Sequence, residues 1–235
     1  MVRAVLFDYG LTLVTFSFPR RELLAALEEV RPWLGAGAPD AATLLRDVLE
    51  PLDAGLATLG EDEIDYLDYF ARGWRRAGFD LPRDTLYRIL DLEQRCWDGA
   101  ARLAPDATVT LEALRARGLR LGIVSNAPFP PEMLHRQLRR LGLAERVDAA
   151  VFSSEIGRRK PAPELYRAAL ERLGVAPDET LYVGDRLLED YEGPRRLGMP
   201  AVLCTALARE PAPAGVPTIA RLSELIGCLD RRRPA

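Results

Sequence analysis

Short, continuous apolar runs recur along the second half of the chain and once near its beginning. The first run, Val5–Phe7, contains no polar residue and stops abruptly at Asp8. Runs without alternation are typical of parallel strands that are covered on both faces of a sheet. The sequence predicts strands at Arg3–Phe7, Leu119–Val124, Ala149–Phe152, Thr180–Val183 and Ala201–Cys204.

Helical patterns fill the intervals between these runs in the second half of the chain. The predicted helices span Pro105–Gly118, Pro131–Gly142, Pro163–Gly174, Leu187–Gly198 and Leu222–Leu229. Strands that alternate with helices of this length indicate right-handed βαβ units. The expected fold class is therefore α/β, with a Rossmann-like parallel sheet.

The segment between these two regions has a different rhythm and contains no strand-like run. Leu23, Leu27, Val30 and Leu34 follow one another at intervals of 4, 3 and 4, which is helical spacing. Similar patterns recur up to Gly99, separated by glycines and prolines. This predicts an all-helical module of roughly four helices.

The first strand belongs by its pattern with the second half of the chain, so the helical module is an insertion. We expect residues 1–15 and 100–235 to form the Rossmann-like core and residues 16–99 to form a helical cap domain. The hinges between them are expected near Thr15–Pro19 and Gly99–Pro105.

Polar side chains follow the ends of the predicted strands. Asp8 comes directly after the first strand, and in open α/β sheets ligands bind at the carboxyl edge. Asp8 is therefore a candidate site residue. The competing interpretation is that Asp8 only caps the next helix or forms a turn, a common use of aspartate after strands.

Ser125 and Asn126 follow the second apolar run. A serine hydroxyl and the N–H groups of the turn after it are suited to hold a phosphoryl oxygen. The alternative is an ordinary helix start, in which one of the two residues caps toward Pro131.

Lys160 is the only lysine among 32 basic residues. Lysine is a compact point charge, unlike the planar fork of arginine. Pro161 and Pro163 suit the start of the following helix, which places Lys160 near the same edge of the sheet. A lysine in this place suggests a cation that meets a phosphate, although a single lysine must fall somewhere.

Asp185 and Asp190 follow the strand that ends at Val183. Carboxylate oxygens from separate strand ends are the ligands that Mg²⁺ takes, so Asp185 is placed to share a metal with Asp8. Asp190 either supports the metal or holds Lys160. The alternative is that both acids only favour a helix N-terminus.

Together, strand ends that carry Asp, Ser, Lys and Gly-Asp in that order resemble the haloacid dehalogenase superfamily of hydrolases. Residues 8–12 resemble its first motif, Ser125 and Asn126 its second, Lys160 and Pro161 its third, and Gly184 and Asp185 with Asp190 its fourth. The helical segment resembles the family's cap of the first type. The resemblance covers essentially the whole chain.

The resemblance implies a hydrolase, with Asp8 as the nucleophile that forms an aspartyl-phosphate for water to hydrolyse. It implies Mg²⁺ held by Asp8, the backbone carbonyl of Gly10 and Asp185. Asp190 would support the metal or Lys160. The substrate would be a small phosphorylated metabolite, whose phosphoryl group is bound by Thr12, Ser125, Asn126 and Lys160.

Gly10 departs from the family pattern. Phosphatases of this family usually carry a second aspartate at this position as general acid and base, a role worth about 10²–10⁴-fold in rate. The glycine carbonyl still offers a metal ligand, but the proton donor is missing. We expect a slow or leaving-group-sensitive phosphatase, unless Tyr9 or a cap residue substitutes.

Other branches of the family fit less well. The dehalogenase branch shares the Ser-Asn motif, but it dispenses with the metal and carries a tyrosine where this chain has Gly10. The phosphonate-cleaving branch needs a lysine in the cap, and residues 16–99 contain none. Phosphosugar mutases need the missing aspartate. A catalytically weak member that binds a phosphorylated ligand or a protein partner is a further alternative.

Composition limits the remaining possibilities. The formal charge of −3 gives no net basicity to favour a nucleic-acid partner, and the basic run Arg231–Arg233 is expected to be solvated. No stretch reaches the length of a membrane span, and no signal peptide is evident. Cys96, Cys204 and Cys228 show neither disulfide nor zinc spacing, so we expect a cytoplasmic protein. His135 is interpreted as structural or surface, and the sequence leaves the oligomeric state open.

Overall fold

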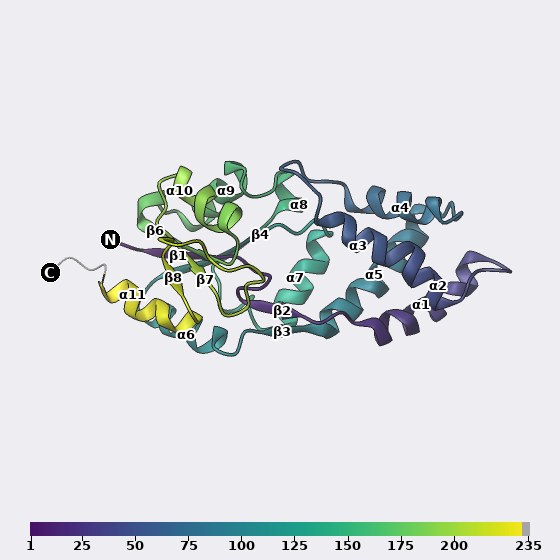
Figure 1. The fold of residues 1–235 in the computed structure, drawn as a ribbon, viewed down its shortest axis with the longest axis horizontal. Coiled ribbons are helices and arrows are strands. Elements are labelled where there is room, and N and C mark those ends of the chain that lie inside the picture. Colours follow the sequence, from purple (N-terminus) through teal and green to yellow (C-terminus); the bar gives the residue numbers. More distant parts are fainter. Residues whose placement is uncertain (232–235) are drawn as a thin grey trace.

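A six-stranded parallel sheet forms the centre of the computed structural model, which describes residues 1–231 (Figure 1). Residues 232 and 233 of the basic run therefore lie outside the described part. The strands, in spatial order, are β5 (Ala149–Phe152), β4 (Arg120–Ser125), β1 (Ala4–Phe7), β6 (Thr180–Gly184), β7 (Ala201–Cys204) and β8 (Thr218–Ile219).

The chain runs outward in opposite directions from β1. It adds β4 and then β5 on one side, and β6, β7 and β8 on the other. Phe7 lies opposite Ile123 of β4 and Val183 of β6, so the three strands end at nearly the same level. The residues that follow them therefore meet at one edge, at the switch point where open α/β sheets bind ligands.

Helices cover both faces of the sheet (Figure 1). Val5 and Phe7 pack in one apolar cluster with residues of α6 (Ala107–Ala116), α7 (Pro131–Arg140) and α11 (Leu225–Arg231). Ala4 and Leu6 pack in another with residues of α9 (Pro163–Leu173). The side chains of β1 thus alternate between two faces of the sheet that are both buried under helices, and this confirms the predicted α/β class. The remaining short helices of the core are α8 (Ser153–Ile156), α10 (Gly193–Arg196), η2 (Pro177–Glu179), η3 (Leu187–Glu192) and η4 (Leu222–Glu224).

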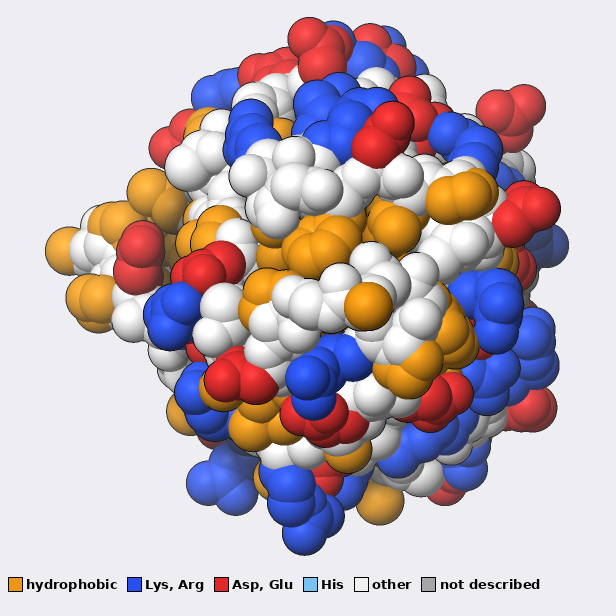
Figure 2. All heavy atoms as spheres, turned by 90° about the vertical axis from the view of Figure 1, so that its right-hand side faces the viewer, with side chains coloured by type: hydrophobic (Ala, Val, Ile, Leu, Met, Phe, Trp, Pro, Cys, Tyr) orange, Lys and Arg blue, Asp and Glu red, His pale blue; other side chains and the backbone are white. Residues whose placement is uncertain are grey.

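The helical insertion has its own apolar cluster, in which Phe70 and Trp74 are fully buried. Its helices extend away from the end of the molecule that holds the N-terminus (Figure 1). They are α1 (Arg20–Leu34), α2 (Ala41–Leu44), η1 (Leu45–Leu49), α3 (Glu50–Leu56), α4 (Tyr66–Arg76) and α5 (Arg83–Ala100), of which α2, η1 and α3 follow one another directly. On the outer face, basic and acidic side chains alternate between small apolar groups (Figure 2). No helix within residues 1–231 is long and apolar enough to cross a membrane.

The two connections between insertion and core form a small ribbon that the sequence did not predict. β2 (Val14–Phe16) pairs with β3 (Ala101–Leu103) in antiparallel fashion. Each strand has only three residues, too few to carry a periodic signal. β8 was not predicted either, because its two residues are also too few to show a pattern. The predicted helix at Leu187–Gly198 is also irregular, because it begins as the π-helical turn η3 before α10.

Candidate active site

Asp8 lies at the carboxyl end of β1, at the switch point of the sheet. Its backbone N–H donates to the carbonyl oxygen of Val183, 2.8 Å away, which continues the pairing of β1 with β6 by one residue. Asp8 is only 8% exposed. A carboxylate this deeply buried needs a compensating charge or a proton.

Lys160 supplies that charge. Its Nζ lies 2.6 Å from Oδ1 of Asp8 and 2.7 Å from Oδ1 of Asp190, and it also contacts the hydroxyl of Tyr182 at 3.1 Å. Burial disfavours the ammonium, but the carboxylates of Asp190 and Asp8 outweigh this and raise the pKa of Lys160. These contacts therefore favour the charged form of the lysine.

Asn126 holds the backbone of Lys160 from both sides. Its Oδ1 accepts the Lys160 N–H at 2.7 Å, and its Nδ2 donates to the Lys160 carbonyl oxygen at 3.1 Å. Asn126 of the second motif thus fixes the backbone of Lys160 in the third motif. In this structure the amide of Asn126 is turned toward Lys160.

Asp190 connects the lysine to the turn after β6. Its Oδ2 accepts the backbone N–H groups of Asp185, at 3.1 Å, and Arg186, at 3.0 Å. A Cβ on Gly184 would lie 2.3 Å from Cγ of Asp190, so only glycine leaves room for this carboxylate. Contact with Lys160 is one of the two roles that the sequence left open for Asp190, and its carboxylate also lies close to those of Asp8 and Asp185.

Asp8, Asp185 and Asp190 form an acidic cluster, with one carboxylate oxygen from each lying within 4.8 Å of the others. Burial raises the pKa of Asp8 to about 7, against the lowering effect of Lys160 and with a further rise from the other two carboxylates. Burial and Asp190 raise the pKa of Asp185 to about 6. Hard oxygen donors with excess negative charge fit a divalent cation such as Mg²⁺.

Thr12 follows Asp8 by four residues, Ser125 ends the neighbouring strand β4, and both are buried. Oγ1 of Thr12 is buried and has no hydrogen-bond partner among residues 1–231. The turn that carries it is tight, with Leu11 at a φ of 60° and the Leu11 N–H bonded to the Val14 carbonyl. An unpaired buried hydroxyl is costly, and a phosphoryl oxygen would satisfy it.

Comparison with known proteins identifies the family. A model of the haloacid dehalogenase-like hydrolases matches residues 2–198. The chain belongs to this family. It is 42% identical over 202 residues to a glyceraldehyde 3-phosphate phosphatase of Methanopyrus kandleri, across 86% of this chain and 83% of that protein. Both findings confirm the predicted resemblance, and this family member is a hydrolase.

Solved structures agree with this assignment. A HAD phosphatase from Thermococcus onnurineus is similar over 97% of this chain and 98% of its own, with 25% identity and a TM-score of 0.65. A 2-haloacid dehalogenase from Pseudomonas syringae shares the fold over 99% of this chain and 100% of its own, with 24% identity and a TM-score of 0.68.

Tyr9 of this hydrolase does not point its hydroxyl at the acidic cluster. The group donates to Oε1 of Gln137 at 2.7 Å, and Gln137 in turn donates to Asp98 of α5 at 2.9 Å. Burial and the charge of Asp98 raise the pKa of Tyr9 far above its ordinary value. The suggestion that Tyr9 replaces the missing acid at Gly10 is therefore not supported.

Sequence reasoning missed two polar groups of the insertion. Glu93 of α5 is buried, and its Oε2 has no hydrogen-bond partner in the described part of the chain. Burial and the charge of Asp53 raise the pKa of Glu93 to about 8. The other is Glu63, which pairs with Arg159. Glu63 follows Asp62 and Glu93 precedes Gln94, so each lies in a polar segment where an acid usually faces solvent.

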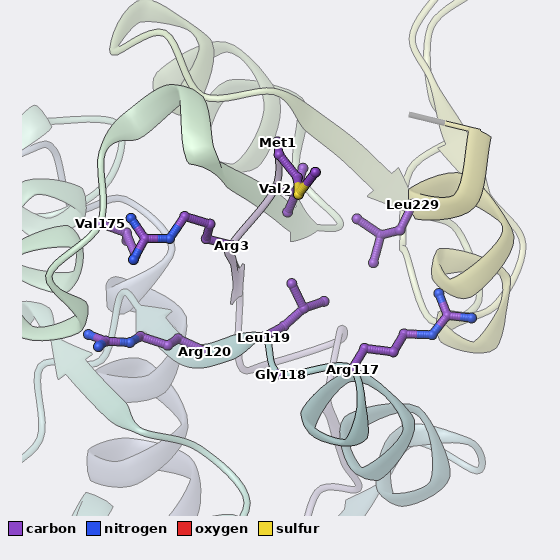
Figure 3. Close-up of a pocket in the computed structure, with 9 residues that line it drawn as sticks. All are labelled: Met1, Val2, Arg3, Arg117, Gly118, Leu119, Arg120, Val175 and Leu229. Carbon is purple, nitrogen blue, oxygen red and sulfur yellow. The ribbon is translucent and has the colours of Figure 1, made fainter. Parts of the chain in front are cut away.

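A hollow of about 270 Å³ lies at the opposite edge of the sheet, where β1 and β4 begin (Figure 3). Three arginines line it. Arg3 pairs with Glu179 at 3.2 Å and Arg117 with Asp230 at 2.9 Å, whereas Arg120 donates to the carbonyl of Leu173. Because Asp8 follows the other end of β1, this hollow is not part of the acidic site.

Glu93 provides a test of the buried electrostatics. A carboxyl group with a folded pKa of about 8 keeps its proton while the unfolded chain, with a pKa of about 4.3, loses it. The free energy of unfolding should therefore fall as the pH rises from about 4 to about 8. Glu93→Gln should remove this pH dependence. In denaturant unfolding at several pH values, the free energy of unfolding of the variant should therefore rise relative to that of the wild type, by up to a few kcal/mol between about pH 4 and pH 8. Glu29→Gln, on the exposed face of α1, is the control. If the free energy of unfolding of Glu93→Gln varied with pH in parallel with that of the wild type, the assignment would be contradicted.

Proposed function

We propose that this protein is a Mg²⁺-dependent phosphatase that hydrolyses a small phosphorylated metabolite through Asp8. The observation that carries the proposal is the buried ammonium of Lys160, within 2.7 Å of both Asp8 and Asp190. It lowers the pKa of Asp8 against the rise that burial causes, and so favours the charged, nucleophilic form of the carboxylate. The same positive charge favours a bound phosphate.

In the first step, an oxygen of Asp8 attacks phosphorus, the bond between phosphorus and the leaving alkoxide breaks, and the alkoxide takes a proton from solvent water. In the second step, water attacks phosphorus and gives up a proton to solvent, and the bond to Asp8 breaks to release phosphate and restore the carboxylate. Lys160 lowers the repulsion between the carboxylate and the phosphate in both steps. Thr12 and Ser125 donate hydroxyl hydrogen bonds to the phosphoryl oxygens, and Asn126 fixes Lys160 in place.

Mg²⁺ would be held by Asp8, the carbonyl of Gly10 and Asp185, and when bound it offsets the charges of the carboxylates and the phosphate. The acidic cluster supports this assignment, because Lys160 alone does not balance three carboxylates within 4.8 Å of one another. Asp190, whose oxygens bind Lys160 and two backbone N–H groups, acts through these contacts.

The insertion of residues 16–99 is proposed to be the cap that sets substrate size. Tyr66 of α4 packs on Phe129, which lies in the loop just after Asn126, with ring centroids 4.6 Å apart. The insertion thus contacts the loop that follows Ser125 and Asn126. The similar archaeal protein is named for glyceraldehyde 3-phosphate, which is therefore a suitable first substrate to assay.

An aryl phosphate tests the reaction itself, because an aryl leaving group barely needs a general acid. We expect Mg²⁺-dependent release of phosphate, and we expect Asp8→Asn to lower kcat by at least about 10³-fold. Asp178→Asn, on the surface, should leave the rate unchanged. A folded wild type that hydrolyses no phosphate ester with Mg²⁺ would favour the alternative, a silent member that binds a phosphorylated ligand or a protein. Halide release from a 2-haloacid would favour dehalogenation.

Gly10→Asp tests the missing proton donor. A Cβ at this position would meet only Phe16 Cε2, at 3.7 Å, which is ordinary contact, so the backbone leaves room for a side chain to start here. The variant should raise kcat for an alkyl phosphate by about tenfold or more and change the aryl phosphate rate far less. Steady-state kinetics on both substrates decide the point. Equal alkyl rates for the folded variant and the wild type would refute this account of Gly10.

A further inference from the structure

A short segment of the insertion pairs directly with the loop that carries Lys160. The N–H of Glu63 donates to the carbonyl of Gly157 at 3.1 Å, and the N–H of Arg159 donates to the carbonyl of Glu61 at 2.8 Å. Asp62 and Arg158 face each other in this antiparallel bridge. We call residues 61–63 and 157–159 the clasp. In Figure 1 the loop before α4 reaches the core beside α8 at this place.

A buried ion pair reinforces the clasp. Nη1 of Arg159 lies 3.0 and 2.9 Å from the two carboxylate oxygens of Glu63. The side chains are 11% and 2% exposed, respectively, so both charges are almost removed from water. The neighbouring pair of Arg158 and Asp62 differs, because the Asp62 side chain is 88% exposed. The two pairs therefore allow a matched comparison within one bridge.

The clasp ends one residue before Lys160. Asn126 of the core grips the backbone of Lys160, and Glu61 and Glu63 of the insertion grip Arg159. The loop is thus fixed from two sides that belong to different parts of the fold. Loss of the Glu63 charge would leave a nearly buried guanidinium without its partner, which is costly enough to move the loop.

We propose that Glu63 is a positioning residue for the reaction, because the clasp transmits the seated position of the insertion to the ammonium of Lys160. The proposal rests on the proposed function for the role of Lys160. This role requires the clasp to stay closed through turnover, so the substrate would reach Asp8 by another side of the insertion. Lys160 meets Asp8 in the correct place only while the insertion is seated.

Removing the Glu63 charge tests the proposal first. Glu63→Gln should lower kcat for an aryl phosphate by about tenfold or more, with KM changed by less than about threefold, because positioning and not binding is disturbed. Asp62→Asn, which removes the exposed pair of the same bridge, should leave both constants unchanged. A Glu63→Gln enzyme with the kcat of the wild type would overturn the proposal.

A covalent clasp separates positioning from a general loss of structure. Asp62 and Arg158 form a non-hydrogen-bonded pair, in which Cα atoms are about 4.5 Å apart, and a disulfide accepts this separation. In the Glu63→Gln background, Asp62→Cys with Arg158→Cys should recover most of kcat when oxidised and lose it again when reduced. An oxidised enzyme that stays inactive would show that the clasp must open or that Glu63 acts otherwise, and either result would overturn the proposal.

Hydrogen exchange gives a readout that does not depend on activity. The amides of Arg159 and Lys160 are bonded to Glu61 and Asn126, respectively. Glu63→Gln should speed their exchange by about tenfold or more while the amides of β1 stay protected. Unchanged exchange at Arg159 and Lys160 would overturn the clasp. An inactive wild type with faster exchange in the variant would overturn the proposed function and leave the clasp intact.

Discussion

The structure depends on one buried charge, the ammonium of Lys160. It lies between Asp8 and Asp190, and its contacts with Asp8, Asp190 and Tyr182 measure 2.6, 2.7 and 3.1 Å. Burying a carboxylate without such a partner would either protonate it or destabilise the fold. Much of the surrounding architecture serves to hold this group, since Asn126 grips its backbone and Gly184 leaves room for Asp190. The same contacts would prepare Asp8 for its proposed role as nucleophile.

The parallel register of the sheet explains why these residues meet. Strands β4, β1 and β6 end at nearly the same level, so residues far apart in the chain reach one edge. The insertion then touches this edge at two places, through Tyr66 on Phe129 and through Glu63 on Arg159. The sheet thus places the acidic residues together, and the insertion contacts the loops around them.

Most of the core could be predicted from the sequence, and part of the site as well. Apolar runs gave the strands because a parallel strand is buried on both faces, and the residues after them, Asp8, Lys160, Asp185 and Asp190, lie together as the strand-end argument requires. The contact between Glu63 and Arg159 could not be foreseen, because 96 residues separate them in segments without periodicity. Tyr182 was hidden for another reason. It looks like an ordinary strand residue, and only its neighbours reveal that its hydroxyl meets Lys160.

The central claim is that Asp8 is the nucleophile whose charge Lys160 maintains. The most direct test is to mix the protein with Mg²⁺ and an aryl phosphate, quench with acid within milliseconds, and determine by mass spectrometry which peptide carries a phosphoryl group. The account predicts the added group on Asp8 in the wild type and its absence in Asp8→Asn. Rapid release of phosphate with no modification of Asp8 at any quench time, or modification at another residue, would contradict it.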